Sequence, residues 1–500
     1  MPVYRFGPFR LDTDGYRLTR GDAPVQTSPR QLDLLACLAA EPSRLITRDE
    51  LFDRLWAGVA VTDNALTQLV SELRQTLGDS SGEPRYVQTV ARRGYRFIAP
   101  VERIESPAMA ATASPSLGGL ATPQTSSLDV LRAVSDGRLQ LEALDESQIE
   151  GAIQNFTHAI RLDPTFAAGY IGLANAHFWQ YERSRSWFRP DAALLALAIS
   201  EARQGLALAP DFAEAHATLA YLLAASDRGA KATAAARQAI ALQPNNWGHH
   251  FRLGHAAWGQ ERLDALARCL QLYPQFPFAY FQMAMVHVAR QALDVARRVL
   301  QEGVALQVRL GAGRSRFPAN GLHWMCGSVL LTRGDVAGAL VEFDLERDDG
   351  GTLYGREYAV AALNGRAWAL LESGNLREAE AVFRSSLAAH AEQVRPHLGL
   401  AHIARRRGDA GMANVALTEA RQSIERVRQG GRTMEASLMS AAEKLASGQP
   451  DTAAAELESL LLRSDPGPAG WLLPIEPLFH PMSASPGFVD VLKRLAERAA

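Results

Sequence analysis

Hydrophobic and polar residues alternate along residues 3–27 with the two-residue period of a half-buried β-strand. Pairs of turn-forming residues interrupt this alternation at Gly7-Pro8, Asp14-Gly15 and Gly21-Asp22. The segment therefore predicts a small antiparallel sheet.

The period then changes to that of α-helices, three of which are predicted before residue 80. Ser28 and Pro29 suit the N-cap and first turn of a helix that runs to about residue 41. Thr47 and Glu50 have the spacing of a capping box for a second helix, which we expect to extend to residue 56. A third helix is predicted from Asp63 to about residue 78.

The third helix has an apolar stripe and an opposite face of uncharged hydrogen-bonding side chains. The stripe consists of Leu66, Leu69, Val70, Leu73 and Leu77. The opposite face carries Asn64, Thr67, Gln68, Ser71 and Gln75. Such amides and hydroxyls suit the base edges of a DNA major groove, because they form hydrogen bonds without the desolvation cost of an ion. The alternative is a polar face that is merely solvated.

Residues 85–100, RYVQTVARRGYRFIAP, predict a β-hairpin with Arg92, Arg93 and Gly94 at its tip. Behind a helix in the major groove, a basic hairpin of this kind reaches the neighbouring DNA backbone or minor groove. The alternative is a solvated arginine pair on an ordinary hairpin. The order of sheet, three helices and basic hairpin, at domain-sized spacing, favours DNA binding.

Five motifs in this order resemble the OmpR/PhoB-type winged-helix DNA-binding domain: FGPFRLD, SPRQLDLLACLA, TRDELFDRLW, VTDNALTQLVSELRQTLGD and YVQTVARRGYRFIAP. The resemblance covers residues 3 to about 100 and implies that the helix 63–77 is the recognition helix. It also implies that Arg74 and the hairpin, or wing, hold the DNA backbone. Many phosphorylated members carry arginine directly after the Thr-Val of the wing, where this chain has Ala91. The minor-groove role therefore falls to Arg92 or Arg93.

In those response regulators a phosphoacceptor domain precedes the winged helix, whereas here we expect none. The arrangement resembles the CadC/ToxR-type one-component regulators, which place this domain first and a sensor after it, often across a membrane. This chain has no run of about 18 apolar residues, and residues 106–128 contain three prolines, which is typical of a linker. Because a signal-peptide pattern is also missing at the N-terminus, we expect a cytoplasmic protein without a membrane anchor.

The charge balance limits how this chain binds DNA. The formal net charge is −2, and residues 1–103 hold fourteen arginines, no lysine and thirteen acidic residues, a net of +1. DNA affinity therefore depends on how these charges are sorted onto faces. We expect modest binding as a monomer, and tandem or homo-oligomeric occupancy of DNA.

From residue 145 onward the chain is helical and Ala-rich, and proline recurs at Pro164, Pro210, Pro244 and Pro274. A repeat of about 34 residues, which these prolines approximate, indicates helix-turn-helix units of a solenoid. Later units begin at glycine turns, each followed by a small and then a large residue: Ala339 and Phe343, Ala379 and Phe383, Ala413 and Leu417, Ala453 and Leu457. This pattern, with small residues where helices cross and large residues in the seam between them, resembles that of the tetratricopeptide repeat family.

In that family the first helix of each pair lines an inner groove. The repeat register assigns nine side chains to this groove: Phe178, Tyr221, Phe251, His255, Trp258, Phe281, Met285, Trp324 and Trp368. So many aromatic side chains on one concave wall are unexpected for a solvated surface, and they predict a groove for a protein, a peptide or an apolar effector. The alternative is that they pack against one another or against the C-terminal tail.

No catalytic arrangement is recognisable in the sequence. His249, His250 and His255 have no Cys or paired carboxylate at ligand spacing. The glycine loop at residues 311–315 lacks the lysine of a phosphate-binding loop. We therefore expect no enzymatic activity, no cofactor and no metal ion.

The sequence thus predicts a mainly α protein with four parts: a winged helix-turn-helix (α+β) at 1–103, a flexible linker at 104–126, a tetratricopeptide-repeat α-solenoid of eight or nine imperfect units at 127–465, and a capping tail at 466–500. The predicted function is that of a one-component transcriptional regulator. Its repeats would sense a partner protein, a peptide or a small effector and control DNA binding or oligomerisation. Two alternatives stay open: a scaffold protein anchored to DNA by its winged helix, and an undetected hydrolase or cyclase activity in the repeats.

Overall fold

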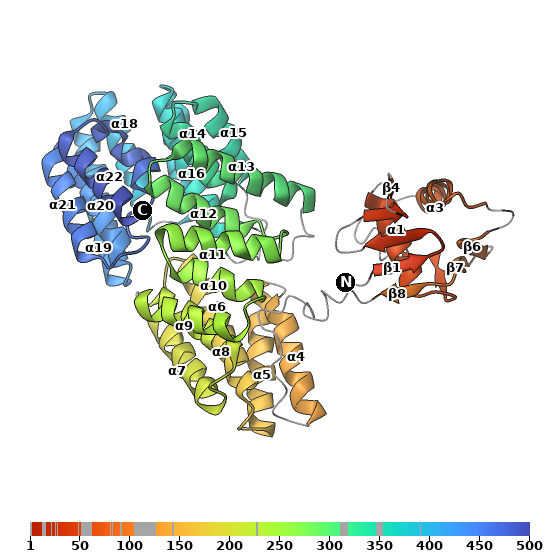
Figure 1. The fold of residues 1–500 in the computed structure, drawn as a ribbon. Coiled ribbons are helices and arrows are strands. Elements are labelled where there is room, and N and C mark those ends of the chain that lie inside the picture. Colours follow the sequence, from red (N-terminus) through yellow and green to blue (C-terminus); the bar gives the residue numbers. More distant parts are fainter. Residues whose placement is uncertain are drawn as a thin grey trace. The chain divides into compact units, whose positions relative to one another are not determined.

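The computed structural model describes residues 3–12, 17–21, 23–25, 27, 29–48, 50–51, 63–80, 82, 84–90, 93–104, 127–142, 145–226, 229–310, 319–346, 354–390 and 392–500. The chain divides into two compact units, Met1–Pro115 and Ser116–Ala500. Each unit is described by itself (Figure 1). The predicted linker lies, from residue 105 onward, outside the described residues.

The N-terminal unit begins with the predicted antiparallel sheet. Strands β1 (Val3–Phe6), β2 (Phe9–Asp12), β3 (Arg17–Arg20) and β4 (Ala23–Val25) form a meander, and β8 (Glu102–Ile104) pairs with β1 at the other edge. Because side chains alternate between the two faces of a strand, the hydrophobic residues on one face of these strands point into the core. Five of them are at most 7% exposed: Tyr4, Phe6, Phe9, Leu11 and Leu18.

The described helices and the wing of this unit follow the predicted order, with a short strand between the helices that was not predicted. They are α1 (Pro29–Ala40), the short strand β5 (Leu45–Thr47), α3 (Asp63–Leu77), β6 (Val87–Val90) and β7 (Gly94–Phe97). The predicted capping box is present: the Thr47 N–H donates to Glu50 Oε2 at 2.9 Å, and the Glu50 N–H donates to Thr47 Oγ1 at 3.2 Å. The rest of the helix expected after it, residues 52–56, lies outside the described residues.

The second unit is a solenoid of antiparallel helix pairs that follow one another in sequence order (Figure 1). The described residues hold nine pairs: α4 (Leu128–Glu142) with α5 (Ile149–Leu162), α6 (Ala167–Ser186) with α7 (Ala192–Leu208), α8 (Ala213–Ala225) with α9 (Gly229–Leu242), α10 (Trp247–Ala256) with α11 (Gly259–Leu272), α12 (Phe278–Ala289) with α13 (Leu293–Leu310), α14 (Leu322–Thr332) with α15 (Val336–Leu345), α16 (Gly355–Glu372) with α17 (Leu376–Ala389), α18 (Arg395–Arg406) with α19 (Ala410–Gln429), and α20 (Thr433–Ala446) with α21 (Pro450–Arg463).

Small and large residues alternate in the seams between helices, as the repeat register predicts. Ala339, Ala379, Ala413 and Ala453 are at most 2% exposed, and the large residues four positions after them are at most 3% exposed. Glycine permits the closest approaches: a Cβ on Gly399 would lie 2.2 Å from the Phe383 ring. Close packing of this kind makes the pairs one continuous core.

The fourth pair departs from the register because α10 ends early, at Ala256. Arg262 occupies a seam position where other units have alanine, and it is only 3% exposed. Its Nε donates to the Ala257 carbonyl at 3.0 Å, and its Nη2 donates to the His255 carbonyl at 2.9 Å. The arginine therefore satisfies carbonyls that the shortened helix leaves open, although burial lowers the pKa of its guanidinium to about 9.

The tail after residue 465 packs against the last pair and also against earlier ones. It contains η2 (Leu473–Ile475), η3 (Pro477–Met482) and α22 (Pro486–Arg498). Helix α22 contacts α21, as expected of a cap, but also contacts α12, and η2 contacts both α12 and α14. The tail thus covers first helices in the middle of the array as well as capping its end.

Candidate DNA-binding surface and repeat surface

Helix α3 presents two opposite faces in the N-terminal unit. Leu66, Leu69, Val70, Leu73 and Leu77 are at most 6% exposed and pack into the core. Thr67, Gln68, Ser71 and Gln75 are exposed on the other side. Asn64 belongs to the same helix, but its side chain is outside the described part of the chain. The apolar stripe fixes the orientation of the helix, so the polar row faces outward, where a ligand can reach it.

Gln68 and Thr67 have hydrogen-bond partners on the protein. The Gln68 amide donates to Glu72 Oε1 at 3.0 Å, one turn further along α3. Arg48 Nη2 donates to Thr67 Oγ1 at 3.4 Å. These bonds are solvent-exposed, so a base edge or phosphate can replace them at low cost.

Arg74 connects α3 to the wing. Its Nη2 donates to the Val87 carbonyl at 2.7 Å and to Thr89 Oγ1 at 2.8 Å, both on β6. The resemblance assigns Arg74 to the DNA backbone, and that role stays a prediction. In the free protein this guanidinium positions the wing relative to the recognition helix.

Asp79, just after α3, is a second positioning residue, which the sequence analysis did not identify. Its carboxylate accepts hydrogen bonds from the backbone N–H groups of Arg85 at 2.6 Å and Val87 at 2.8 Å. These bonds fix the start of β6 at the end of α3. An aspartate directly after the glycine that follows a helix is a weak sequence signal, because many such aspartates are solvated turn residues.

The described tip of the wing is basic and lies beside another arginine. Arg93 is exposed, and its carbonyl accepts a hydrogen bond from the Arg48 N–H at 3.2 Å. The Arg48 side chain also reaches α3, so this residue joins the wing tip to the recognition helix. Arg92 lies outside the described residues. Arg48 was missed because it is far from the wing in sequence.

Glycine is needed at position 94 of the wing because a neighbouring strand approaches its backbone closely, rather than because of the turn. It pairs with Thr47 of β5, and a Cβ on Gly94 would lie 2.0 Å from the Ile46 carbonyl oxygen. Only glycine permits this approach between strands. The three strands β5, β7 and β6 therefore form one sheet that carries the basic tip.

In the solenoid, eight of the nine residues assigned to the groove lie on first helices, from α6 to α16. Trp258 does not, because the register assumed that α10 continues beyond its actual end at Ala256. Its indole instead lies at the start of α11, with the Arg262 guanidinium 4.7 Å from the ring centroid. The placement of Trp258 on a first helix is therefore wrong.

These side chains do not line an open aromatic groove. Phe178, Phe251, Phe281 and Trp368 are between 3% and 7% exposed; Tyr221, His255, Trp258, Met285 and Trp324 are partly buried. Ring centroids of neighbouring units lie close together, at 4.9 Å for Phe178 and Tyr221 and 4.3 Å for Tyr221 and His255.

The tail completes this packing. The Trp471 ring lies 6.4 Å from both Phe281 and Trp324, measured between centroids. The alternative stated from sequence, that the aromatic residues pack on one another and on the tail, describes their contacts in this structure. The expectation of an open groove failed because spacing along a helix does not show what covers that helix.

The three histidines near residue 250 point to separate partners. His249 contacts Gln243 Oε1 at 3.1 Å, His250 contacts the Pro244 carbonyl at 2.8 Å, and His255 contacts the Gln282 amide at 3.0 Å. Burial lowers the pKa of His249 to about 3, with a smaller contribution from Arg252. In the part of the chain that the structure describes, no three His, Cys, Asp or Glu side chains gather to hold a metal ion.

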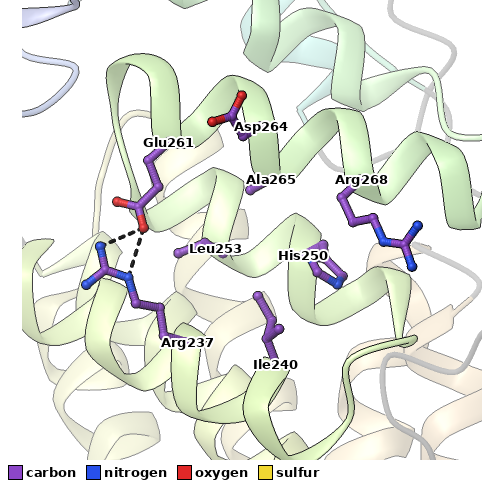
Figure 2. A pocket seen from close by; sticks show the side chains of 8 residues that line it. All are labelled: Arg237, Ile240, His250, Leu253, Glu261, Asp264, Ala265 and Arg268. Atoms are coloured by element: carbon purple, nitrogen blue, oxygen red, sulfur yellow. Dashed lines mark hydrogen bonds and ion pairs between the residues drawn. The ribbon is translucent and has the colours of Figure 1, made fainter.

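A pocket of about 300 Å³ lies between α9, α10 and α11 (Figure 2). It is lined by Arg237, Ile240, His250, Leu253, Glu261, Asp264, Ala265 and Arg268. Two hydrogen bonds, of 2.9 and 2.6 Å, join Arg237 to Glu261 across its rim. Arg268 Nη1 donates to Gln271 Oε1 at 3.1 Å, and His250 contacts the Pro244 carbonyl, so each basic side chain of the lining has a partner on the protein.

Comparison with known proteins identifies the class of the N-terminal unit. Residues 22–97 match the family model described as "Transcriptional regulatory protein, C terminal". The range includes α1, α3 and both strands of the wing. The N-terminal unit is therefore an OmpR/PhoB-type winged-helix DNA-binding domain, which confirms the resemblance stated from sequence.

Relatives match a stretch of similar length to that of the N-terminal unit. The transcriptional activator CadC of Escherichia coli is 36% identical over 101 residues, which are 20% of this chain and 20% of that protein. The cholera toxin transcriptional activator of Vibrio cholerae is 46% identical over 83 residues, 16% of this chain and 28% of that protein. This chain thus spans less than a third of the length of either relative.

Among solved structures, yeast Tom70 aligns with 88% of this chain and 82% of its own, at 16% identity and a TM-score of 0.40. The solenoid assignment rests instead on the nine helix pairs and their seams. No helix in the described part of the chain is long and apolar enough to span a membrane.

Proposed function

We propose that this chain is a one-component transcriptional regulator. Its N-terminal unit binds specific sequences of duplex DNA, and its repeat unit responds to a partner protein, a peptide or a small effector and thereby alters DNA binding or oligomerisation. The observation that carries the proposal is the exposed row of Thr67, Gln68 and Ser71 on α3, next to the arginine wing.

The geometry of the unit supports this function. The buried leucine stripe of α3 leaves one polar face exposed, and Arg74 and Asp79 hold the wing at the end of that helix. A helix with uncharged hydrogen-bonding groups suits base edges, and a basic hairpin beside it suits phosphates. The relatives carry names of transcriptional activators, which supports the same role here.

Selection from a random library of duplex DNA tests sequence-specific binding. Residues 1–105 contain the whole core of the compact unit Met1–Pro115, so they suit the experiment as an isolated domain. We expect a short preferred sequence to be enriched, and the full chain to bind it with a different affinity or stoichiometry. A pool that stays random after repeated rounds would contradict specific DNA binding.

A further inference from the structure

Residues 182–189, at the C-terminal end of α6, contact helices that lie far along the chain; we name this segment the clasp. The Tyr354 hydroxyl donates to Glu182 Oε2 at 2.5 Å, and Arg185 Nη1 lies 3.2 Å from Glu357 Oε1. Arg189 Nη2 lies 3.3 Å from Glu392 Oε1. In a regular solenoid each unit contacts only its neighbours. The clasp instead joins the second helix pair to the seventh and to the turn after it.

The clasp also places two aromatic side chains against basic residues. The Phe188 ring lies 4.3 Å from the His390 ring, and the Arg432 guanidinium lies 4.9 Å from the Phe188 centroid. The Arg356 guanidinium lies 4.2 Å from the Trp187 centroid. The surface that receives the clasp, the acceptor surface, therefore offers carboxylates to arginines and cations to aromatic rings. It consists of Tyr354, Arg356, Glu357, His390, Glu392 and Arg432.

The backbone at this contact adopts a conformation that favours glycine. Phe188 has φ of 63° and Tyr354 has φ of 71°, two of the four non-glycine residues with positive φ among the described residues. The Phe188 N–H bonds the Arg185 carbonyl and the Arg189 N–H bonds the Ser184 carbonyl, which is the Schellman pattern that usually places glycine at this position. An aromatic residue at this position indicates that the contact of its ring with the acceptor surface offsets the cost of a positive φ at the helix end.

The clasp differs from the C-terminal tail in how firmly it is held. The tail is part of the core, with Phe479 at 1% and Leu495 at 0% exposed. In the clasp, Trp187 is 49% exposed and the Arg189 side chain is 77% exposed, whereas Glu182 and Ser186, inside α6, are 6% and 2% exposed. Exposed ion pairs and cation–π contacts are individually weak and are screened by salt. The part of the clasp that follows α6, residues 187–189, can therefore leave its site while the helices stay folded.

We propose that the clasp is an intramolecular pseudo-ligand. The acceptor surface binds a peptide segment of a partner protein in which aromatic residues lie between arginines, and residues 182–189 occupy the surface until such a segment displaces them. This inference rests on the proposed function, because it identifies the partner segment as the signal that the repeats receive. Displacement frees the end of α6 from α16 and opens the solenoid.

The test measures binding of a fluorescent peptide with the sequence of residues 181–191 to the full chain. In the wild type the tethered clasp competes at an effective concentration of roughly millimolar, so we expect weak binding. The variant Trp187→Ala/Phe188→Gly, which places glycine where φ is positive, should bind the peptide at least about tenfold more tightly. Adding Glu357→Gln and Arg432→Ala to that variant should abolish the gain.

Two results would overturn the proposal: no gain in the clasp variant, or a gain that survives the acceptor substitutions. If the double variant melts below the wild type, Phe188→Gly alone, which removes only one side chain and its strained backbone, provides the same comparison. The control is a peptide of residues 181–191 in which glutamate replaces Arg185 and Arg189. DNA binding of the same preparations is measured in parallel, so that failure of the regulator hypothesis remains distinguishable from failure of the clasp.

Discussion

Gln68 is the exposed amide near the centre of the polar face of α3, and its bond to Glu72 is the interaction that a base edge would replace. An amide of this kind contacts adenine with two hydrogen bonds, whereas alanine offers none. Single residues such as this one determine which sequence is bound, while the arginines nearby determine how tightly any DNA is held.

We predict that Gln68→Ala lowers the affinity of residues 1–105 for their preferred sequence by about 1–3 kcal/mol, and changes base preference at one or two positions. Binding to unrelated DNA should stay the same, since the phosphate contacts are unchanged. Measuring the variant against a panel of single-base substitutions checks this. An equal loss for every sequence would make Gln68 a residue that positions the protein on the backbone.

A second residue-level prediction concerns His249, which is 1% exposed in the solenoid. The unfolded chain binds a proton at this ring below pH 6.5, whereas the folded chain does not until about pH 3. Stability associated with this group is therefore fully present above pH 6.5 and falls as the pH drops toward 3.

Between pH 7.5 and pH 5, the free energy of unfolding of the solenoid should fall by about 2 kcal/mol less in His249→Asn than in the wild type. Asparagine keeps a donor for Gln243, and comparison of the two pH values within each protein removes the constant cost of the substitution. Denaturant unfolding at both pH values gives the difference. An identical pH dependence in both proteins would show that folding does not lower the pKa of His249.

The sequence predicted the exposed residues of α3 because a helical period alone separates the leucine stripe from Thr67, Gln68 and Ser71. It did not predict the partners of Arg74 or the role of Arg48. Those contacts join residues on different elements, and they form only when β5, β6 and β7 pack together in the tertiary structure. Periodicity thus locates a face, and only the fold identifies its neighbours.

The helix pairs likewise show which contacts between elements the sequence predicts and which it does not. Ala339 and Phe343 were expected in a seam, and both are buried there, since small and large residues at fixed spacing can only interlock in one way. The inner-face prediction placed Phe281 correctly on a first helix, but not its covering by Tyr358 and by Trp471 of the tail. A repeat register does not predict contacts with segments that lie outside the repeats, such as the C-terminal tail.

We predict that Phe281→Ala destabilises the solenoid by about 3–5 kcal/mol, because it empties a core site between three rings. The control is Val308→Ala at a residue that is 70% exposed, where the change should stay within about 0.5 kcal/mol. Urea unfolding followed by circular dichroism measures both. Wild-type stability in Phe281→Ala would show instead that this ring is open to solvent and free to bind a ligand.

Within the whole molecule, the winged helix and the solenoid have separate cores, and each unit is explained by its own pattern of residues. The order of the two units was predictable because strand and helix periods change along the chain near the proline-containing segment. The closure of the solenoid by the clasp was not. Its contacts join positions that are far apart in the chain, and the repeat register relates only neighbouring units.

The central claim is that the polar face of α3 and the arginine wing bind duplex DNA, and the salt dependence of binding tests it most directly. The association constant of residues 1–105 for a fixed duplex is measured at several salt concentrations, for the wild type and for Arg92→Ala/Arg93→Ala. We predict saturable wild-type binding, and a slope of log K against log salt that is shallower by about one or two charges in the variant. No wild-type binding at low salt, or an unchanged slope in the variant, would contradict the account.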